Sequence, residues 1–314
     1  MTVDVIVATY NGEKYLKEQL HSILNQTYKD IRVLIRDDNS TDATVSIIRD
    51  IARLDSRVIF IQDDISPNGV GENFKNLLKN CTADYVLLAD QDDVWLDTKI
   101  EKLLSFSKRK FSNNIPSIAY SPGVVVDEEL NRTDRLTIYT NGVNSIADIF
   151  LTNGGVQGCS MIVNKALYNM ALKSDFFWYM HDQVLTLYAV SFGEVFFMNE
   201  PLFLYRQHQA NVIGYNNSKC IDKLRRYFPL WNDSFVVSRQ SNDLFHFFYR
   251  ENECFLSERN KKIFEVFFSL STSCKISNMK KIIKYRLKLN NSVSMAVVKS
   301  VLCVNFNEKN DAAK

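Results

Sequence analysis

The sequence predicts an α/β fold in which helices flank a mostly parallel central sheet, followed by a helical C-terminal extension. Over the first ninety residues, short β-branched apolar segments alternate with amphipathic ones, a pattern typical of right-handed β-α-β units. The 314 residues are 46% hydrophobic and include only five prolines, so the chain can bury a large core. All ten glycines lie at or before Gly214, and from about residue 217 onward we expect several helices.

The expected elements follow in order along the chain. Four strands are predicted at residues 3–8, 31–35, 58–61 and 85–89. Apolar residues at helical spacing lie between them and predict helices, one of which covers residues 42–54 with Ser40 or Thr41 as its N-cap. Farther along we expect a helix over 95–107, an extended segment over 118–126, a polar loop over 131–144, a strand over 159–163 and a helix over 183–192.

Charge divides the chain into two parts. Residues 215–314 carry 18 Lys and Arg against 9 Asp and Glu, whereas residues 1–214 carry 20 against 27. We therefore expect an α/β domain over residues 1–215 and a basic helical extension over residues 216–314. Residues 280–289 are predicted to form a basic amphipathic helix with Ile276, Met279, Ile283 and Leu287 on one stripe. This helix either lies on an anionic membrane or packs on the rest of the protein with a solvated basic face.

Several classes of protein are disfavoured by what the sequence lacks. No run reaches the ~18 apolar residues of a transmembrane helix, and the N-terminus has no signal-peptide pattern. The six cysteines show no CxxC pair, as expected for reduced thiols in the cytoplasm. No nucleic-acid-binding signature occurs. We expect a cytoplasmic protein with, at most, peripheral contact with the inner face of the cell membrane.

Polar residues follow three of the predicted strands. The first strand ends in Thr9-Tyr10-Asn11, the second in Asp37-Asp38 and the fourth in Asp90-Gln91-Asp92-Asp93. Ligands of parallel sheets bind at the carboxyl ends of the strands, so these residues predict a site. Neither a G-x-G-x-x-G fingerprint nor a Walker A sequence is present, and phosphate charge would need a metal ion instead.

The carboxylates of Asp90 and Asp92 can share one hard divalent cation, Mn²⁺ or Mg²⁺. Such an ion would neutralise the charge of a departing diphosphate. The alternative is an acidic turn that caps the next helix. Because two other polar strand ends are predicted beside it, we favour the metal site.

Together, the segments 5–11, 37–44 and 90–95 resemble the inverting family 2 glycosyltransferases, over roughly residues 1–215. The resemblance implies a GT-A fold, a Rossmann-like architecture, in a catalytic domain that moves a sugar from a nucleotide-diphosphate donor to an acceptor hydroxyl. The residues that it implies for the nucleobase and ribose are Ala8, Thr9, Tyr10 and Asp38. Asp90 and Asp92 match the family's DxD motif, with Asp92 as the direct metal ligand.

The finer features of the resemblance concern the donor. The variant Asp-Gln-Asp-Asp-x-Trp is similar to bacterial rhamnosyltransferase-like members, which use dTDP-L-rhamnose in surface-polysaccharide assembly (O-antigen or capsule). A carboxylate at Asp38 would accept the imide N–H of uracil or thymine, which favours UDP or dTDP donors; alternatively, Asp38 caps the helix over 42–54. Residues 67–74 resemble a segment that flanks the nucleotide, which places Asn73 near it, although an ordinary turn explains them equally well.

Asp182 is the carboxylate that the resemblance implies as general base, at the start of a helix. Inverting transfer requires a base to take the proton of the acceptor hydroxyl. Asp175 and Glu194, the other carboxylates nearby, match no motif, and capping of the helix over 183–192 is the alternative for Asp182. His181 is expected to orient its neighbours.

Arg206 and His208 belong to residues 205–211, which are similar to a family segment after the last core strand. Arg206 is expected to contact the diphosphate, and His208 either contacts it or completes the metal shell. A purely structural histidine is the alternative.

The sequence thus predicts an inverting, metal-dependent glycosyltransferase whose acceptor is a glycan or a polyprenyl-diphosphate-linked sugar. Two other functions stay open. One is a sugar-nucleotide pyrophosphorylase, disfavoured because the glycine-rich loop after the first strand is missing. The other is a non-catalytic nucleotide-sugar-binding subunit, disfavoured because every carboxylate that the chemistry needs is present.

Overall fold

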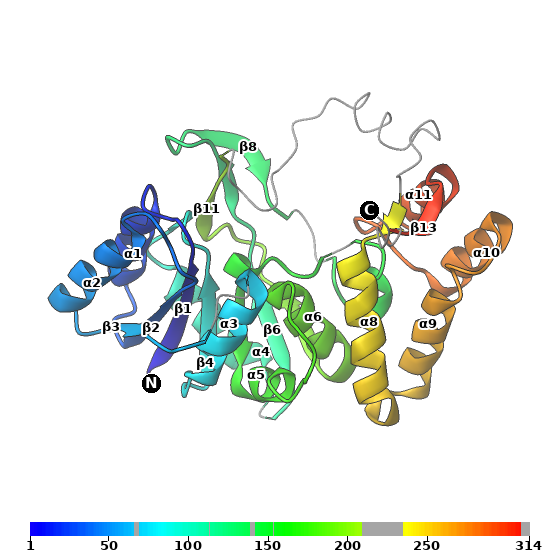
Figure 1. Cartoon of the computed structure of the whole chain (residues 1–314), viewed down its shortest axis with the longest axis horizontal. Coiled ribbons are helices and arrows are strands. Elements are labelled where there is room, and N and C mark those ends of the chain that lie inside the picture. Colours follow the sequence, from blue (N-terminus) through cyan, green and yellow to red (C-terminus); the bar gives the residue numbers. More distant parts are fainter. Residues whose placement is uncertain (66–68, 113, 139–141, 153, 209–234, 309–314) are drawn as a thin grey trace. The chain divides into compact units, whose positions relative to one another are not determined.

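The computed structural model describes the chain except for residues 66–68, 113, 139–141, 153, 209–234 and 309–314 (Figure 1). It contains two compact units. The first comprises residues 1–141, 156–189 and 193–214, and the second comprises residues 142–155, 190–192 and 215–314. The predicted boundary between residues 215 and 216 lies outside the described residues.

A seven-stranded sheet forms the centre of the first unit, in the order β10-β6-β9-β4-β1-β2-β3. Strands β3, β2, β1 and β4 are parallel, β9 runs antiparallel to β4 and β6, and β10 is parallel to β6. This arrangement confirms the mostly parallel sheet. The bounds are β1 Val3–Thr9, β2 Ile31–Asp37, β3 Val58–Ile61, β4 Tyr85–Ala89, β6 Ser117–Tyr120, β9 Met161–Asn164 and β10 Glu194–Phe197.

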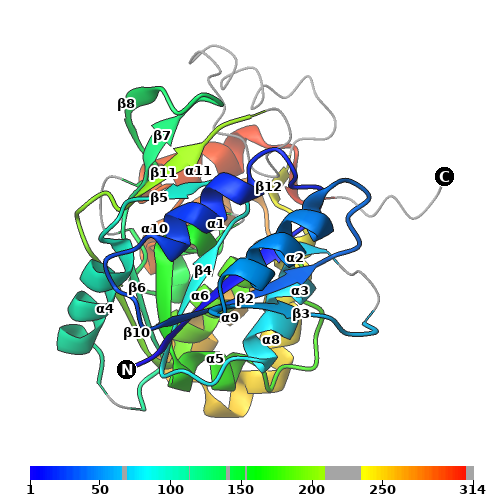
Figure 2. The same ribbon diagram turned by 90° about the vertical axis from the view of Figure 1, so that its left-hand side faces the viewer.

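Helices bury both faces of this sheet (Figure 2). Val5 and Val7 of β1 belong to an apolar cluster that includes residues of α1, α2 and α4. Ile6, which points to the opposite face because side chains alternate along a strand, is also fully buried, and α3 contacts β1 and β2. The helices are α1 Leu16–Leu24, α2 Thr44–Leu54, α3 Val70–Lys79, α4 Lys99–Lys110, α5 Lys165–Ala171 and α6 His181–Phe192.

A smaller sheet, in the order β5-β11-β7-β8, corrects two predictions. Trp95 does not begin a helix; it lies in β5 (Val94–Trp95) and pairs with Phe203 of β11 (Phe203–Arg206), and α4 begins at Lys99. The predicted polar loop over 131–144 contains the strand β8 (Arg132–Leu136), which pairs with β7 (Val124–Val126). Four of the five β8 residues are exposed, so this edge strand has none of the apolar alternation that would have predicted it.

The second unit is mainly helical, with α8 Arg239–Asn252, α9 Glu258–Phe268, α10 Lys275–Tyr285 and α11 Val293–Leu302 beside two short strands, β12 Phe235–Val237 and β13 Asn305–Asn307. Phe150 anchors its core, with ring centroids 4.8, 5.0 and 4.4 Å from those of Phe245, Phe264 and Phe267. No helix in the described part of the chain is long and apolar enough to cross a membrane.

The predicted basic helix over 280–289 is wrong at its C-terminal end. Helix α10 ends at Tyr285, and Arg286 takes a left-handed conformation with φ 53°. Beyond this break Leu287 is fully buried, so it is not part of the exposed stripe, and Lys288 pairs with Asp148 at 2.8 Å.

Candidate active site

The carboxyl ends of β1 and β2 lie side by side, because Thr9 pairs with Asp37 in the parallel register. The Thr9 hydroxyl donates to Asp37 Oδ1 at 2.8 Å, and the Asp38 backbone N–H donates to the Thr9 carbonyl at 2.9 Å. Ala8, half-buried in β1, lies opposite Arg36. These bonds fix the first two polar strand ends against each other and leave the Tyr10 side chain 58% exposed.

Gln91 connects the β1 end to the acidic turn after β4. Its side-chain amide accepts from the Tyr10 N–H and donates to the Tyr10 carbonyl, both at 2.9 Å. A Cβ added to Gly12 would lie 2.4 Å from Gln91 Oε1, so glycine makes room for this contact. Gln91 was expected only as part of a motif variant, and nothing in the sequence pattern indicated this role.

Asp38 does not cap α2. Asp42 accepts from the Thr44 N–H at 3.0 Å at the start of that helix, while the Ser40 hydroxyl, one of the two predicted caps, donates to Asp37. The Asp38 carboxylate, only 9% exposed as a residue, accepts from the Gly69 N–H at 2.9 Å. It lies 3.5 Å from the Arg36 guanidinium. The capping alternative for Asp38 is therefore excluded.

Asn73 lies behind this pair. It is buried, its side-chain oxygen accepts from Arg36 Nη1 at 3.2 Å, and its amide group donates to the Arg36 carbonyl at 3.1 Å. Arg36 also forms an ion pair with Asp63 at 2.9 Å. The contacts described for Asn73 hold Arg36 in place, and its contact with a nucleotide stays a prediction.

The acidic turn after β4 divides its carboxylates between two groups. Asp90, Asp93 and Cys159 bring potential ligand atoms within 4.8 Å of one another. Asp92 instead faces His208, whose Nε2 lies 2.8 Å from Asp92 Oδ2. Asp90, Asp92 and His208 are the metal ligands that the sequence predicts, and the structure adds Asp93 to the acidic cluster.

Lys99, at the first turn of α4, is fully buried beside this cluster. Its ammonium donates to the Cys159 carbonyl at 2.6 Å and lies 3.9 Å from the Trp95 ring centroid. Burial lowers the pKa of Lys99 to about 8, although the charges of Asp93 and Asp90 oppose this effect. The sequence held a signal that was missed, since Lys99 and the buried Leu103 are four residues apart on the apolar face of the helix.

Burial and mutual repulsion disfavour negative charge in the cluster. Burial raises the pKa of Asp90 to about 7, with the Asp92 charge as the next cause and the Asp182 charge as a smaller one. Burial likewise raises the pKa of Asp93 well above its ordinary value, and the charges of Asp92 and Asp90 add to this. A bound cation would relieve this repulsion.

Arg206, at the end of β11, is buried and holds the acidic turn. Its Nε donates to the Asp92 carbonyl at 2.9 Å, its backbone N–H donates to Asp93 Oδ1 at 3.2 Å, and it forms an ion pair with Glu18. The guanidinium carbon lies 4.6 Å from the Tyr15 ring centroid. These contacts make Arg206 a positioning residue for Asp92, and its contact with a diphosphate stays a prediction.

Asp182 lies in the first turn of α6, near enough to Asp90 for its charge to raise the pKa of Asp90. Burial raises the pKa of Asp182 itself to about 6, although its carboxylate accepts from the Gln183 N–H at 2.7 Å. The preceding His181 is buried, which lowers its pKa to about 3 and keeps the ring neutral. The first turn of α6 thus presents a carboxylate beside the acidic cluster.

Two glycines allow the residues just before Asp182 to pack closely on their neighbours. A Cβ on Gly158 would lie 2.2 Å from His181 Nε2, and the centroid of the His181 ring lies 3.7 Å from that of Phe74 in α3. A Cβ on Gly71 would lie 1.9 Å from the Trp178 carbonyl oxygen. The segment before α6 is therefore held tightly against α3, which fixes where Asp182 points.

The residues present fit a hard divalent cation. Asp93 Oδ2 is buried and has no hydrogen-bond partner within the described ranges, and the carboxylate oxygens of Asp90 and Asp92 with His208 Nε2 are donors that suit Mn²⁺ or Mg²⁺. Burial raises the pKa of the Cys159 thiol well above its ordinary value. Because only a thiolate binds metal well, Cys159 is a neighbour and not a ligand.

The chain belongs to glycosyl transferase family 2, whose model matches residues 4–170. It is 31% identical to the dTDP-rhamnosyl transferase RfbG of Shigella flexneri over 230 residues, which are 68% of this chain and 75% of the relative. Over 104 residues it is 38% identical to WfaP of Escherichia coli, a UDP-Glc:alpha-D-GlcNAc-diphosphoundecaprenol beta-1,3-glucosyltransferase; this match covers 33% of this chain and 40% of WfaP.

Solved structures confirm the predicted GT-A fold. TarS of S. aureus, residues 1–349 in complex with UDP-GlcNAc, matches with a TM-score of 0.61 at 16% identity, covering 96% of this chain and 90% of that one. The mannosyltransferase PcManGT of Pyrobaculum calidifontis, in complex with GDP-Man and Mn²⁺, matches with a TM-score of 0.52 at 14% identity, covering 95% and 79%. The family makes the protein a glycosyltransferase, and the solved structures show its fold.

Proposed function

We propose that this glycosyltransferase moves a sugar, with inversion, from a UDP- or dTDP-linked donor to a hydroxyl of a glycan or lipid-linked acceptor. The observation that carries the proposal is the position of Asp182 in the first turn of α6. Its carboxylate has a pKa of about 6 and lies near enough to Asp90 for its charge to raise the pKa of Asp90. A base of that pKa is largely deprotonated at neutral pH and can still hold a transferred proton. Asp182 takes the acceptor proton, and the diphosphate leaves on the side of the acidic cluster.

The nucleotide half of the donor lies at the ends of β1 and β2. Asp38 accepts the imide N–H of uracil or thymine, Thr9 and Ala8 line the ribose, and the exposed Tyr10 ring stacks on the base. Asp38 is held ready for this by the Gly69 N–H and by Arg36. Cytosine offers no donor at the imide position, which accounts for the proposed preference.

Asp90, Asp92 and His208 would hold Mn²⁺ or Mg²⁺, with Asp93 beside them. When bound, the ion neutralises charge on the leaving diphosphate. The chain's own part is to orient these ligands. Arg206 donates to the Asp92 backbone carbonyl and to the Asp93 carboxylate, and the Gln91 side chain bonds the turn to Tyr10. The Mn²⁺ bound by PcManGT supports this choice of ion.

The narrower proposal is a dTDP-L-rhamnose donor used in surface-polysaccharide assembly at the inner face of the cell membrane. RfbG supports the donor because it is a dTDP-rhamnosyl transferase. WfaP supports a polyprenyl-diphosphate-linked acceptor because its own acceptor is a diphosphoundecaprenol. Such an acceptor places the working enzyme at the cytoplasmic surface of the bilayer.

The test is nucleotide release from UDP-, dTDP- and GDP-sugars in the presence of a lipid-linked acceptor, with Mn²⁺, with Mg²⁺ or with excess chelator. We expect release from a UDP- or dTDP-sugar only with the ion, and NMR of the product should show the anomeric configuration inverted. Nucleotide binding without release would point to the non-catalytic subunit. Formation of a sugar 1-phosphate from donor and pyrophosphate would point to the pyrophosphorylase.

A further inference from the structure

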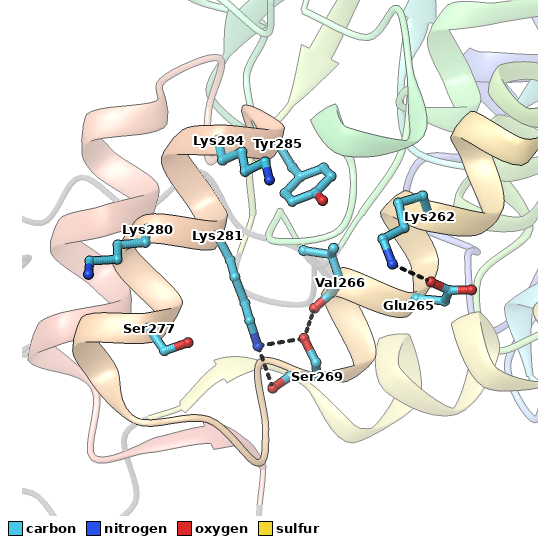
Figure 3. Close-up of a pocket in the computed structure, with 9 residues that line it drawn as sticks. All are labelled: Lys262, Glu265, Val266, Ser269, Ser277, Lys280, Lys281, Lys284 and Tyr285. Atoms are coloured by element: carbon cyan, nitrogen blue, oxygen red, sulfur yellow. Dashed lines mark hydrogen bonds and ion pairs between the residues drawn. The ribbon is translucent and has the colours of Figure 1, made fainter.

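The second unit contains a basic cavity between α9, the end of α10 and residues 144–148. Its volume is about 640 Å³, and five lysines and arginines line it against the single carboxylate of Asp148. A second cavity of about 410 Å³ lies between α9 and α10 and shares Lys262, Lys284 and Tyr285 with the first (Figure 3). Two adjoining hollows therefore face the same lysines.

The ion pairs within the cavity leave several cations uncompensated. Lys288 pairs with Asp148 at 2.8 Å and Lys262 pairs with Glu265 at 2.9 Å. The remaining three lining cations are Arg259, Lys284 and Arg286. None of these three has a carboxylate within ion-pair distance among the residues that the structure describes. Like charges in one concave site raise the local concentration of anions.

Arg286 is held at this site in a conformation that favours glycine. Its φ is 53°, and the Leu287 N–H donates to the Ile282 carbonyl at 3.0 Å, which is the helix-ending motif that glycine usually closes. A side chain in this region costs free energy relative to glycine. The helix ends here, and Arg286 lines the cavity together with Lys284.

Exposed apolar side chains lie on α10, which lines both cavities, and on α11. Ile276 and Ile283 of α10, seven residues apart and so on one helix face, are 68% and 57% exposed. Helix α11, which packs against α10, exposes Met295 and Val298. Exposed isoleucines beside uncompensated lysines and arginines are typical of a surface that lies in the head-group region of a bilayer.

We propose that this cavity binds the phosphate-bearing head group of an anionic membrane lipid, with Arg259, Lys284 and Arg286 as the cations that hold it. The chemistry recognised is a phosphate group, and the source is the bilayer because α10 carries the exposed Ile283 next to Lys284. The inference deepens the proposed function and rests on it in one respect, since a lipid-linked acceptor brings the enzyme to a membrane.

The test uses the full chain and vesicles of phosphatidylcholine with or without phosphatidylglycerol, and no donor or acceptor. The double variant Lys284→Gln/Arg286→Gly removes two cavity cations, and glycine suits the backbone at position 286. Each basic residue near a lipid surface contributes about a fivefold factor, so partition onto the anionic vesicles should fall about 25-fold. The control Arg250→Gln/Lys261→Gln removes two charges from α8 and α9 outside the cavity and should leave partition nearly unchanged.

A soluble arm separates a lipid site from a free-phosphate site. Pyrophosphate should displace the wild type from anionic vesicles more than sodium chloride of equal ionic strength does, and this excess should vanish in the cavity variant. Equal loss in both double variants would show diffuse charge and overturn the proposal, as would equal binding to pure phosphatidylcholine. A rise in the melting temperature of the wild type with pyrophosphate, without a change in its partition onto vesicles, would make the cavity a free-phosphate site. That result would also overturn the proposal.

Failure of this proposal and failure of the proposed function can be told apart. Nucleotide release by the wild type with a water-soluble acceptor tests the transferase alone. Activity there with no cavity-dependent vesicle binding would overturn the lipid site only.

Discussion

Replacing Asp182 with asparagine is expected to remove activity and stabilise the fold at the same time. The amide can still accept from the Gln183 N–H, at 2.7 Å in the wild type, so the first turn of α6 keeps its bond. What the variant loses is the charge. General-base catalysis contributes about 10²–10⁴, and turnover should fall by that factor while donor affinity changes little.

The stability effect follows from the pKa of Asp182, which burial raises from 3.8 to about 6. Two pKa units correspond to about 3 kcal/mol, an upper limit for a residue that keeps some exposure. The folded protein binds this proton more tightly than the unfolded chain does. The free-energy cost of burying the charged Asp182 carboxylate is therefore absent below about pH 4, grows between about pH 4 and 6, and is complete above pH 6. Asp182→Asn should thus be more stable than the wild type by about 1–3 kcal/mol at pH 8, and equally stable near pH 4.

Denaturant unfolding in chelator at both pH values, together with initial rates of nucleotide release, measures these effects. In the wild type, kcat/KM should fall about tenfold per pH unit below pH 6, as the base becomes protonated. Asp175→Asn, a change of an exposed carboxylate in the segment before α6, is the matched control and should alter neither quantity. Near-wild-type turnover of Asp182→Asn, or a loss of stability at pH 8, would refute the reasoning.

Three further changes test the rest of the site. Asp92→Asn should abolish metal-stimulated transfer in a Mn²⁺ titration, whereas the exposed Asp97→Asn should not; full activity in excess chelator would contradict a metal role. Asp38→Asn should weaken UDP and dTDP binding, measured by calorimetry, by about 10–100-fold, because it removes a hydrogen bond to a charged group. GDP binding should not change, and Asp50→Asn, at an exposed carboxylate, is the control. A preference of the wild type for a guanine nucleotide would contradict the role of Asp38. Gly71→Ala should destabilise the fold by about 1–3 kcal/mol and lower turnover, because its Cβ would meet the Trp178 carbonyl. Gly154→Ala is the control, because its Cβ enters open space. Equal melting temperatures of the two variants would argue against the close packing at Gly71.

Local patterns were enough to predict the elements that carry the site. β-branched runs predicted the four parallel strands, and the polar residues that end three of them are those that meet in the structure. Asp38 and Asp90 could be placed because the carboxyl ends of adjacent parallel strands coincide. The end of the 280–289 helix was not predictable from apolar spacing alone, because Leu287 continues the period although Arg286 has already turned the chain.

The local sequence patterns did not predict contacts between residues that are far apart in the sequence. Arg206 meets Asp92 across 114 positions, and Asn73 meets Arg36 across 37. In both cases the resemblance of the surrounding segment to the family suggested ligand contact, and the structure describes bonds to other protein groups. A buried arginine or asparagine needs partners wherever the fold puts it, and a single sequence does not say which residues supply them.

Lys99 and the acidic cluster show why such groups are kept in an apolar core. Asp90 and Asp93 have raised pKa values and Lys99 a lowered one, so each ion is less favourable here than in water. Apolar residues of similar size commonly stabilise a core more than buried ions do, and Trp95, Phe203 and Leu103 already surround Lys99 with such residues. Stability therefore does not explain the cluster. The proposed cation site does, because a divalent ion would offset the repulsion between the carboxylates.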